Sequence, residues 1–255
     1  MSAPVFLAAA GRLGGCTPGS TYVLEGAEAR HAGVVQRRRP GERVDVADGA
    51  GVRLRCTIAS VETGRLVLDV VERLDEPAAP VRLVLVQALA KGDRDELAIE
   101  AATEVGVDEV VPWQAARSVV VWRGERAAKS RAKWLATVRE ATKQARRAHL
   151  PAVDHAVDTR GLVARTREVV GAGGVVLVLH EAAQEPIGSV DLPDPAVGGD
   201  VLVVVGPEGG VSEEELGALA EAGARVVRLG PHVLRTSTAG PVALALLAQR
   251  LGRWA

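Results

Sequence analysis

Residues 201–239, VLVVVGPEGGVSEEELGALAEAGARVVRLGPHVLRTSTA, decide the fold class of this chain. They contain two strand-like runs, the fully apolar residues 201–205 and residues 225–229, and each run leads through a glycine- and proline-containing loop into a helix-like segment. Short and fully apolar runs are typical of parallel strands that are buried on both faces. Ligands of open α/β sheets bind beyond the carboxyl ends of such strands. The stretch therefore predicts a parallel sheet covered by helices, with a ligand pocket at the two loops.

The first loop is Gly206-Pro207-Glu208-Gly209-Gly210. Consecutive glycines let the backbone approach a ligand closely, and a proline stiffens the loop so that binding costs less entropy. A plain strand-to-helix turn explains the same residues equally well. The order of the glycines matches neither a Walker A loop nor the dinucleotide fingerprint.

The second loop runs from Leu229 to Ala239 and places three hydroxyl residues, Thr236 to Thr238, directly after Arg235. One hydroxyl is enough to cap the helix that follows. The surplus of hydroxyls beside an arginine favours contact with a ligand. Two such loops can line one pocket.

The rest of the chain divides into two parts. Residues 1–75 alternate short β-type runs, at 43–47, 52–58 and 66–71, with glycine turns, which predicts a small all-β domain. Residues 75–80 contain two prolines and no periodicity, so they are expected to form a linker. Residues 80–255 form the second predicted domain. Its other expected strands are 81–88, 109–113 and 175–180, and its expected helices are 95–105, 128–148, one beginning at Ser212 with a capping box, and 238–251.

Composition excludes several classes of protein. Hydrophobic residues make up 47% of the chain, which is ample for a buried core, and the two cysteines, Cys16 and Cys56, are too few for a disulfide scaffold. No apolar segment approaches the roughly 20 residues of a membrane span, and the first ten residues make a poor signal peptide. We therefore expect a cytoplasmic protein with no membrane partner. The five histidines show no ligand spacing, so no metal site is expected.

Charge is distributed unevenly although the net charge is only −1. Residues 117–149 carry a net charge of +8, whereas residues 180–255 carry −5. Such asymmetry favours a polyanionic partner. Two basic groups are the candidate contacts: Arg37, Arg38 and Arg39 in the first domain, and Arg139, Lys143, Arg146 and Arg147, whose spacing would place them on one helix face. The alternatives are a turn that simply carries Arg37, Arg38 and Arg39 before Pro40-Gly41, and a solvated face for the helical group. Few acids balance the helical group, which favours contact with a polyanion.

Five segments together resemble a known family: HAGVVQRRRPGERVDVADGAG (31–51), KGDRDELAIEAATEVGVDEVVPW (91–113), WLATVREATKQARRAHLP (134–151), VGPEGGVSEEE (205–215) and LGPHVLRTSTA (229–239). Their order and spacing are similar to those of the 16S ribosomal RNA uridine-N3 methyltransferases, in the SPOUT class. The last two segments are specific to this family when they occur as a pair.

This resemblance implies a PUA-like β-barrel followed by an α/β domain with a C-terminal trefoil knot, a homodimer, and 16S rRNA or the small ribosomal subunit as partner. It implies S-adenosylmethionine as the cofactor. The implied cofactor-binding residues are Leu179, His180, Gly206, Glu208, Gly209, Gly210, Leu229, Gly230, Val233, Leu234, Arg235, Thr236, Thr238 and Ala239. Arg235 is the candidate for stabilising charge on the uracil during methyl transfer, and Glu208 is a candidate proton acceptor or an anchor for loop N–H groups.

The sequence departs from the family at one informative position. The family commonly has Glu between the two threonines of the last motif, where this chain has Ser237, so no catalytic role is assigned there. Two alternatives therefore stay open at this stage. One is a knotted methyltransferase acting on another RNA atom, such as the ribose 2′-hydroxyl, and the other is a non-catalytic RNA-binding assembly factor.

Overall fold

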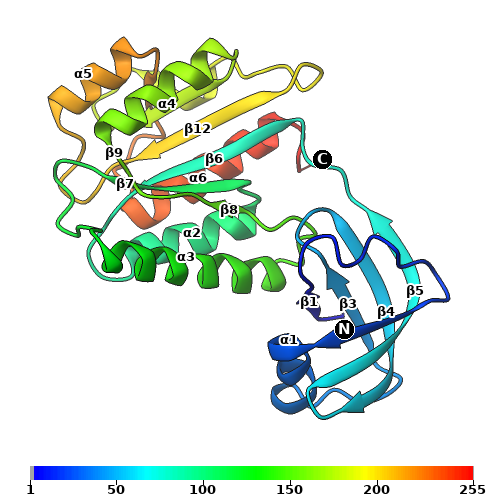
Figure 1. Cartoon of the computed structure of the whole chain (residues 1–255). Coiled ribbons are helices and arrows are strands. Elements are labelled where there is room, and N and C mark those ends of the chain that lie inside the picture. The colour runs from blue at the N-terminus through cyan, green and yellow to red at the C-terminus, as the bar shows by residue number, and fades with distance from the viewer. Residues whose placement is uncertain (1–2, 255) are drawn as a thin grey trace. The chain divides into compact units, whose positions relative to one another are not determined.

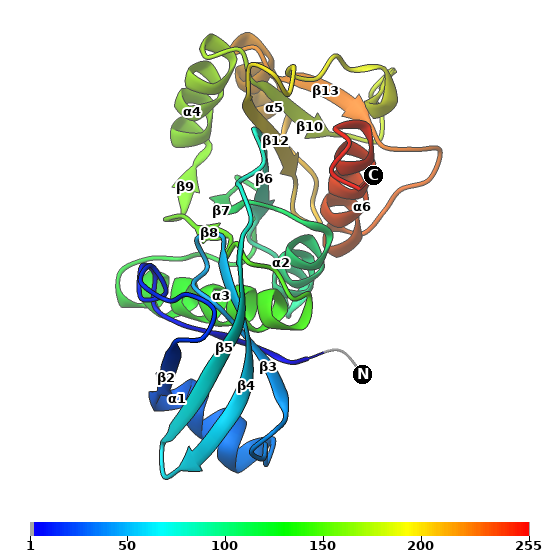
Figure 2. The same cartoon turned by 90° about the vertical axis from the view of Figure 1, so that its right-hand side faces the viewer.

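The computed structural model describes residues 3–254, and these divide into two compact units (Figures 1 and 2). Unit 1 consists of the chain up to Ala78 together with Thr142–Leu150. Unit 2 consists of Ala79–Ala141 and the chain from Pro151 onward. Residues 142–150, which include the end of the predicted basic helix, therefore belong to the β-rich unit.

Unit 1 is built on a mixed five-stranded sheet in the order β1-β3-β4-β5-β2. Its strands are β1 (Val5–Leu7), β2 (Thr21–Glu25), β3 (Arg43–Ala47), β4 (Val52–Glu62) and β5 (Arg65–Asp75), and only the β1–β3 pair is parallel. A short α1 (Gly26–Arg30) continues into a π-helical turn at His31–Val35. Alternate strand residues such as Val44, Val46 and Leu54 are fully buried, so each strand has one face in the core.

Segment 142–150 is tied to the sheet of unit 1 by several hydrogen bonds. Arg53 donates through Nη2 to the carbonyl of Arg146 at 2.7 Å, and His149 Nε2 lies 2.8 Å from the Glu76 carbonyl. Gly51 allows the close approach, because a Cβ there would lie 2.8 Å from His149 Cε1, and its φ of +108° suits glycine. The ammonium of Lys143 lies 3.3 Å from a Glu28 carboxylate, and both side chains are largely buried.

Unit 2 contains a sheet in the order β11-β13-β10-β12-β6-β7-β8, with β9 also paired to β7, and every pairing is parallel. Its strands are β6 (Val81–Ala88), β7 (Glu109–Gln114), β8 (Ala152–Val153), β9 (Val157–Asp158), β10 (Val175–Leu179), β11 (Glu185–Pro186), β12 (Gly199–Val205) and β13 (Arg225–Arg228). The prediction of an α/β chain with a parallel sheet in its second part is confirmed.

Helices cover both faces of this sheet (Figure 1). They are α2 (Arg94–Val105), α3 (Glu125–Gln144), α4 (Thr159–Gly171), α5 (Glu213–Glu221) and α6 (Thr236–Arg250), with a 3-10 turn at Ile187–Ser189. Helices α4 and α5 pack together on one face, and α2 packs on α6 over the other. Gly240 of α6 sits so close to β6 that a Cβ would lie 2.8 Å from Leu85 Cδ1.

The helices differ from the expectations in two places. The basic helix was predicted over residues 128–148, but α3 ends at Gln144, so Arg146 and Arg147 do not share a helix face with Arg139. Helix α4 was not predicted at all. Asp95, in the first turn of α2, is buried although it is charged, and burial raises the pKa of its carboxyl to about 6.

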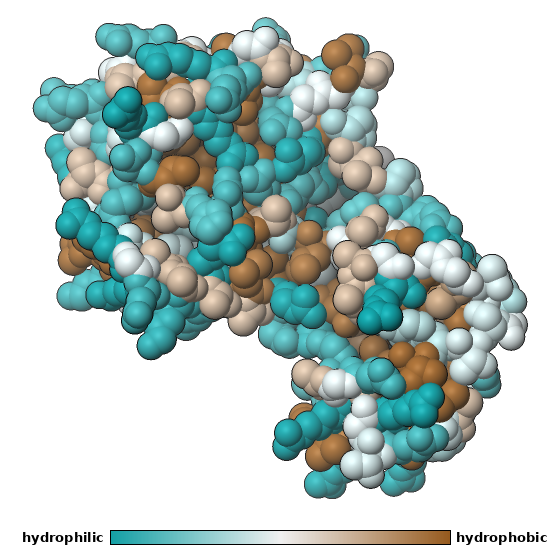
Figure 3. Space-filling model, in the orientation of Figure 1, coloured by the Kyte–Doolittle hydropathy of each residue, from teal (hydrophilic) through white to brown (hydrophobic). Residues whose placement is uncertain are grey.

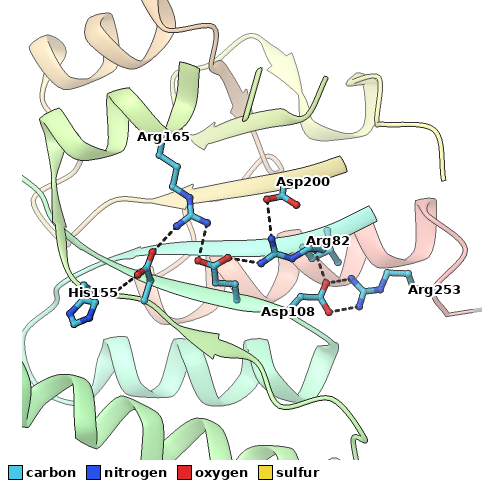
Figure 4. A network of polar contacts seen from close by, with 9 residues as sticks. Arg82, Asp108, His155, Arg165, Asp200 and Arg253 are labelled. Carbon is cyan, nitrogen blue, oxygen red and sulfur yellow. Dashed lines mark hydrogen bonds and ion pairs between the residues drawn. The ribbon is translucent and has the colours of Figure 1, made fainter. Parts of the chain in front are cut away.

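A polar network lies at the amino ends of β6, β7 and β12 (Figure 4). The carboxylate of Glu109 accepts from Arg82 at 2.6 Å and from Arg165 at 2.8 Å. Arg165 also binds Asp154, and Arg82 also binds Asp200. In the same view Asp108 accepts two hydrogen bonds from Arg253. This edge of the sheet is therefore closed by charge pairs.

Replacing Glu109 tests how much this network contributes to the free energy of unfolding. Glu109 is 8% exposed, so Glu109→Gln removes a nearly buried charge and leaves two guanidinium groups less well paired. We expect the free energy of unfolding, measured by urea denaturation, to fall by about 2 kcal/mol. Glu104→Gln, on the exposed side of α2, is the matched control and should change it by less than about 0.5 kcal/mol. Equal stabilities for the two variants would contradict the structural role.

Candidate functional site

A pocket of about 580 Å³ lies in unit 2 where β10, β12 and β13 end. This volume lies within the range of small-molecule sites, which is roughly 300–1,000 Å³. The three strands run parallel, so their carboxyl ends meet at one edge and the loops that follow them converge there. The position agrees with the pocket expected from residues 201–239.

Most of the residues expected at the cofactor site line this one pocket. They are Leu179, His180, Gly206, Glu208, Gly209, Gly210, Leu229, Gly230, Val233, Leu234, Arg235, Thr236 and Ala239. Thr238 does not line it and is exposed in the first turn of α6. Three pocket-lining arginines, Arg94, Arg117 and Arg228, were not among the candidates. Arg94 and Arg117 precede the loops by about a hundred residues, so no local pattern connects them with the site.

The glycines of the first loop are required by their surroundings. A Cβ on Gly206 would lie 2.7 Å from Val211 Cγ2, and one on Gly209 would lie 3.2 Å from Arg117 Cβ. Gly210 has a φ of +75°, which side chains disfavour. Arg117 also donates through Nη1 to the Gly209 carbonyl at 3.0 Å. The segment after β7 therefore forms a wall against which the loop is packed.

Glu208 points its carboxylate at the segment that begins α2. Its Oε1 accepts from Arg94 Nη1 at 2.7 Å and from the Lys91 N–H at 3.2 Å. Burial raises the pKa of the carboxyl, but hydrogen bonds from its own N–H, from Arg94 and from Lys91 outweigh it, so the pKa is lowered. Glu208 is thus held as an ionised group, and its partners lie at α2 instead of at the helix that follows the loop.

Glu215, in the first turn of α5, lies outside the pocket lining but ties the segment that carries Arg117 to two helices. The capping box with Ser212 is present as predicted. In addition, Oε1 of Glu215 accepts from the Ala116 N–H at 2.8 Å and from Thr159 Oγ1 at 2.6 Å. One carboxylate, only 4% exposed, therefore fixes the start of α5, the start of α4 and the segment that carries Arg117.

The second loop reaches the pocket through a threonine hydroxyl. Helix α6 begins at Thr236, and its N-cap residue Arg235 makes no side-chain cap hydrogen bond. The hydroxyl of Thr236 lies 2.8 Å from the Gly206 carbonyl, so it joins the two loops instead of capping the helix. Val233 is 78% exposed and Leu234 is 37% exposed, which leaves apolar surface open at the pocket. Arg235 is also exposed there.

The candidate RNA-binding residues are not equally available. Arg37 and Arg39 are exposed, whereas Arg38 pairs with Glu42 at 3.2 Å. Lys143 is engaged with Glu28. The remaining three candidates differ in exposure: Arg146 is exposed, and Arg139 and Arg147 are half-buried.

Residues 3–254 contain neither a cluster of metal-binding side chains nor a membrane-spanning helix. Within that range no three His, Cys, Asp or Glu side chains cluster in a way that could hold a metal ion. The described helices include none long and apolar enough to cross a membrane. On the face drawn in Figure 3, hydrophilic residues predominate and hydrophobic ones occur in small groups.

Comparison with known proteins places this site in a family. Residues 77–248 match the RNA methyltransferase domain family. The ribosomal RNA small subunit methyltransferase E of Mycobacterium bovis is 48% identical over 92% of this chain and 89% of its own length. The protein of the same name from Bacillus subtilis is 30% identical over 89% and 90%. The crystal structure of a ribosomal RNA small subunit methyltransferase E from Neisseria gonorrhoeae, bound to S-adenosyl methionine, has a TM-score of 0.85 at 27% identity and 98% coverage of both chains.

The fold and the pocket define an α/β protein with a small-molecule site at the carboxyl edge of a parallel sheet. The chain belongs to the RNA methyltransferase family, because the family match and the relatives at 48% and 30% identity cover most of its length. The resemblance inferred from the five sequence segments is confirmed.

The role of Glu215 can be tested through the pH dependence of stability. Burial raises the pKa of Glu215, but hydrogen bonds from Thr159, Ala116 and Ser212 outweigh it and lower the pKa below that of an unfolded glutamate. Its contribution is therefore complete at neutral pH and is lost as the pH falls through the folded pKa. Glu215→Gln should lower the free energy of unfolding by about 2 kcal/mol at pH 7, with a smaller difference from wild type near pH 3.5.

The control is Glu214→Gln, an exposed neighbour in the same helical turn. Urea unfolding at a series of pH values gives the measurement for all three proteins. A difference between Glu215→Gln and wild type that did not shrink at acid pH would show that the ionised carboxylate is not what holds these elements together.

Proposed function

We propose that the protein transfers a methyl group from S-adenosylmethionine to N3 of a uridine in the 16S ribosomal RNA of the small subunit. The observation that carries the proposal is the convergence of the VGPEGG and LGPHVLRTSTA loops on one pocket at the carboxyl edge of the sheet. The names of the relatives and the cofactor bound to the Neisseria protein support it.

The lining of the pocket fits S-adenosylmethionine chemically. Leu179, Val205 and Leu229 offer apolar walls for a purine, and the glycine loops offer main-chain N–H and C=O groups for its edge. Glu181 supplies negative charge for the cationic groups of the cofactor, and Arg228 supplies positive charge for its carboxylate. Both kinds of charge that the cofactor carries therefore have partners.

The bound cofactor supplies an activated methyl group, and the protein supplies orientation and electrostatics. Uridine N3 has a weakly acidic proton that leaves before or during attack on the methyl carbon, and negative charge then spreads over the uracil oxygens. The exposed guanidinium of Arg235 is the proposed stabiliser of that charge. For Glu208 the two roles stay predictions, and its ion pair with Arg94 favours the role of anchor over that of proton acceptor.

The finer features of the family are part of the proposal. They are a PUA-like barrel in the first 75 residues, a SPOUT domain with a trefoil knot in residues 80–255, a homodimer, and action in the cytoplasm during ribosome biogenesis. We further propose that RNA contacts Arg37, Arg38, Arg39, Arg139, Lys143, Arg146 and Arg147 to different extents. The exposed members, Arg37, Arg39 and Arg146, are expected to contribute most.

Methylation of small subunits tests the reaction. Subunits purified from cells that lack the gene should accept one methyl group when incubated with the protein and S-adenosylmethionine. Mass mapping of the RNA should place that group on N3 of a single uridine. A methyl on a ribose 2′-oxygen or on another base would overturn the N3 assignment. Cofactor binding without any transfer would favour the non-catalytic assembly factor.

Substitution of Gly209 tests the position of the cofactor. Gly209→Val should weaken binding of S-adenosylmethionine at least about 100-fold, because the side chain would press on Arg117 and displace the loop. Gly217→Val, in α5 where a Cβ meets nothing within 4 Å, is the control. Isothermal titration calorimetry measures the affinity of both variants. If Gly209→Val bound the cofactor as wild type does, the cofactor would lie elsewhere.

A further inference from the structure

A buried glutamine connects the sheet to both pocket loops. Gln87, near the carboxyl end of β6, is fully buried, and its Nε2 lies 2.9 Å from the hydroxyl of Thr236. That hydroxyl in turn lies 2.8 Å from the carbonyl of Gly206. Thr236 is itself only 8% exposed. The three groups form a chain from the middle of the sheet through the second loop to the first.

The direction of the hydrogen bonds in this chain follows from the number of protons. The Gln87 amide has two protons, and its second acceptor is the Ala88 carbonyl at 3.2 Å. Rotating the amide would turn its oxygen toward that carbonyl, which is repulsive, so Ala88 fixes the orientation. Thr236 then accepts from Gln87, and its single hydroxyl proton remains for Gly206.

An amide is a costly choice at this position. The rest of β6 that faces the interior is apolar, and Oε1 of Gln87 has no hydrogen-bond partner among the described residues. Leaving a buried polar atom unpaired costs about 1–3 kcal/mol, which a leucine would avoid. The strand pattern of residues 81–88 gives no reason for a polar residue at position 87.

We propose that Gln87 is a positioning residue for the cofactor site. By donating to Thr236 it directs the threonine proton to the Gly206 carbonyl, and this bond holds the two loops at the separation that the cofactor requires. The inference rests on the proposed function, since S-adenosylmethionine is the ligand whose binding reports on the loops. Neither Gln87 nor the Thr236 proton takes part in methyl transfer.

The first test removes the hydroxyl. Thr236→Val keeps the shape of the side chain but loses the donor, so binding of S-adenosylmethionine, measured by calorimetry, should weaken about tenfold. Thr236→Ser keeps the donor and should bind within about threefold of wild type. Thr166→Val is the matched control, because Thr166 is also fully buried, donates to a carbonyl of its own helix α4, and lies outside the pocket lining.

The second test reverses the direction of the hydrogen bond. In Gln87→Glu the ionised carboxylate accepts the Thr236 proton, so Gly206 loses its donor and cofactor affinity should fall about tenfold at pH 8.5. At low pH the protonated acid can donate to Thr236 again, and burial makes protonation easier. The ratio of variant to wild-type affinity should therefore recover as the pH falls to about 6. Asp95, whose pKa burial raises to about 6, titrates in this window in both proteins, and Glu208, whose pKa is lowered, stays ionised in both, so the ratio reports on residue 87.

The third variant separates positioning from stability. Gln87→Leu should leave the free energy of unfolding in urea unchanged or increase it, because the unpaired Oε1 is removed, while affinity falls about tenfold at every pH. If Thr236→Val binds as wild type does, or if Gln87→Glu follows Gln87→Leu at all pH values, the inference is wrong. If the wild-type protein itself does not bind S-adenosylmethionine, the proposed function fails instead.

Discussion

The parallel register of the strands in unit 2 is the constraint on which the rest of the structure depends. Strand β12 pairs with β6 over seven residues from Gly199↔Val81 to Val205↔Gln87, and with β10 on its other side as far as Val204, so the carboxyl ends of these strands lie side by side. Amino and carboxyl ends are thereby sorted to opposite edges of the sheet. At the amino ends of the strands, charged side chains pair with one another, as Glu109 does with two arginines. At the carboxyl ends lie the glycine-containing loops. A register shifted by one residue would exchange the two faces of each strand and misplace both loops.

The loops at the carboxyl edge are shaped more by what supports them than by their own residues. The glycines permit close packing but do not choose a conformation. The conformation is fixed by hydrogen bonds from distant side chains. Arg117 donates to the Gly209 carbonyl, Arg94 to the Glu208 carboxylate and Thr236 to the Gly206 carbonyl. The segment that carries Arg117 is itself held by Glu215, which accepts a hydrogen bond from the Ala116 N–H. A site that binds a ligand through main-chain groups requires such external supports, since the ligand contacts themselves cannot fix the loop before binding.

The sequence predicts the local features of this fold and misses the long-range ones. Strands β3 and β6 have the predicted bounds, and the capping box at Ser212 is present, because apolar runs and caps are set by neighbouring residues. The resemblance of the five segments identified the pocket loops. Helix α4 was missed because its sequence TRGLVARTREVVG includes glycine and β-branched residues that disfavour helices, and packing against β10 and α5 overrides that preference. Gln87 and Glu215 were assigned to ordinary elements and Arg94 to none, since their partners lie up to 149 residues away.

A count of charges along the sequence does not show which basic residues are free to bind RNA, because it does not show which of them have partners within the protein. Residues 117–149 carry a net charge of +8, yet much of that charge is used inside the protein. Arg117 binds the Gly209 carbonyl, Arg131 binds the carbonyls of Val153 and Asp154, Lys133 pairs with Glu96, and Lys143 pairs with Glu28. A guanidinium bonded to a carbonyl keeps its charge but has fewer donors for phosphate, and a lysine paired with a carboxylate presents little net field. The positive charge available to a polyanion is therefore smaller than the net charge of residues 117–149. It is carried by the side chains whose charged groups are exposed and unpaired.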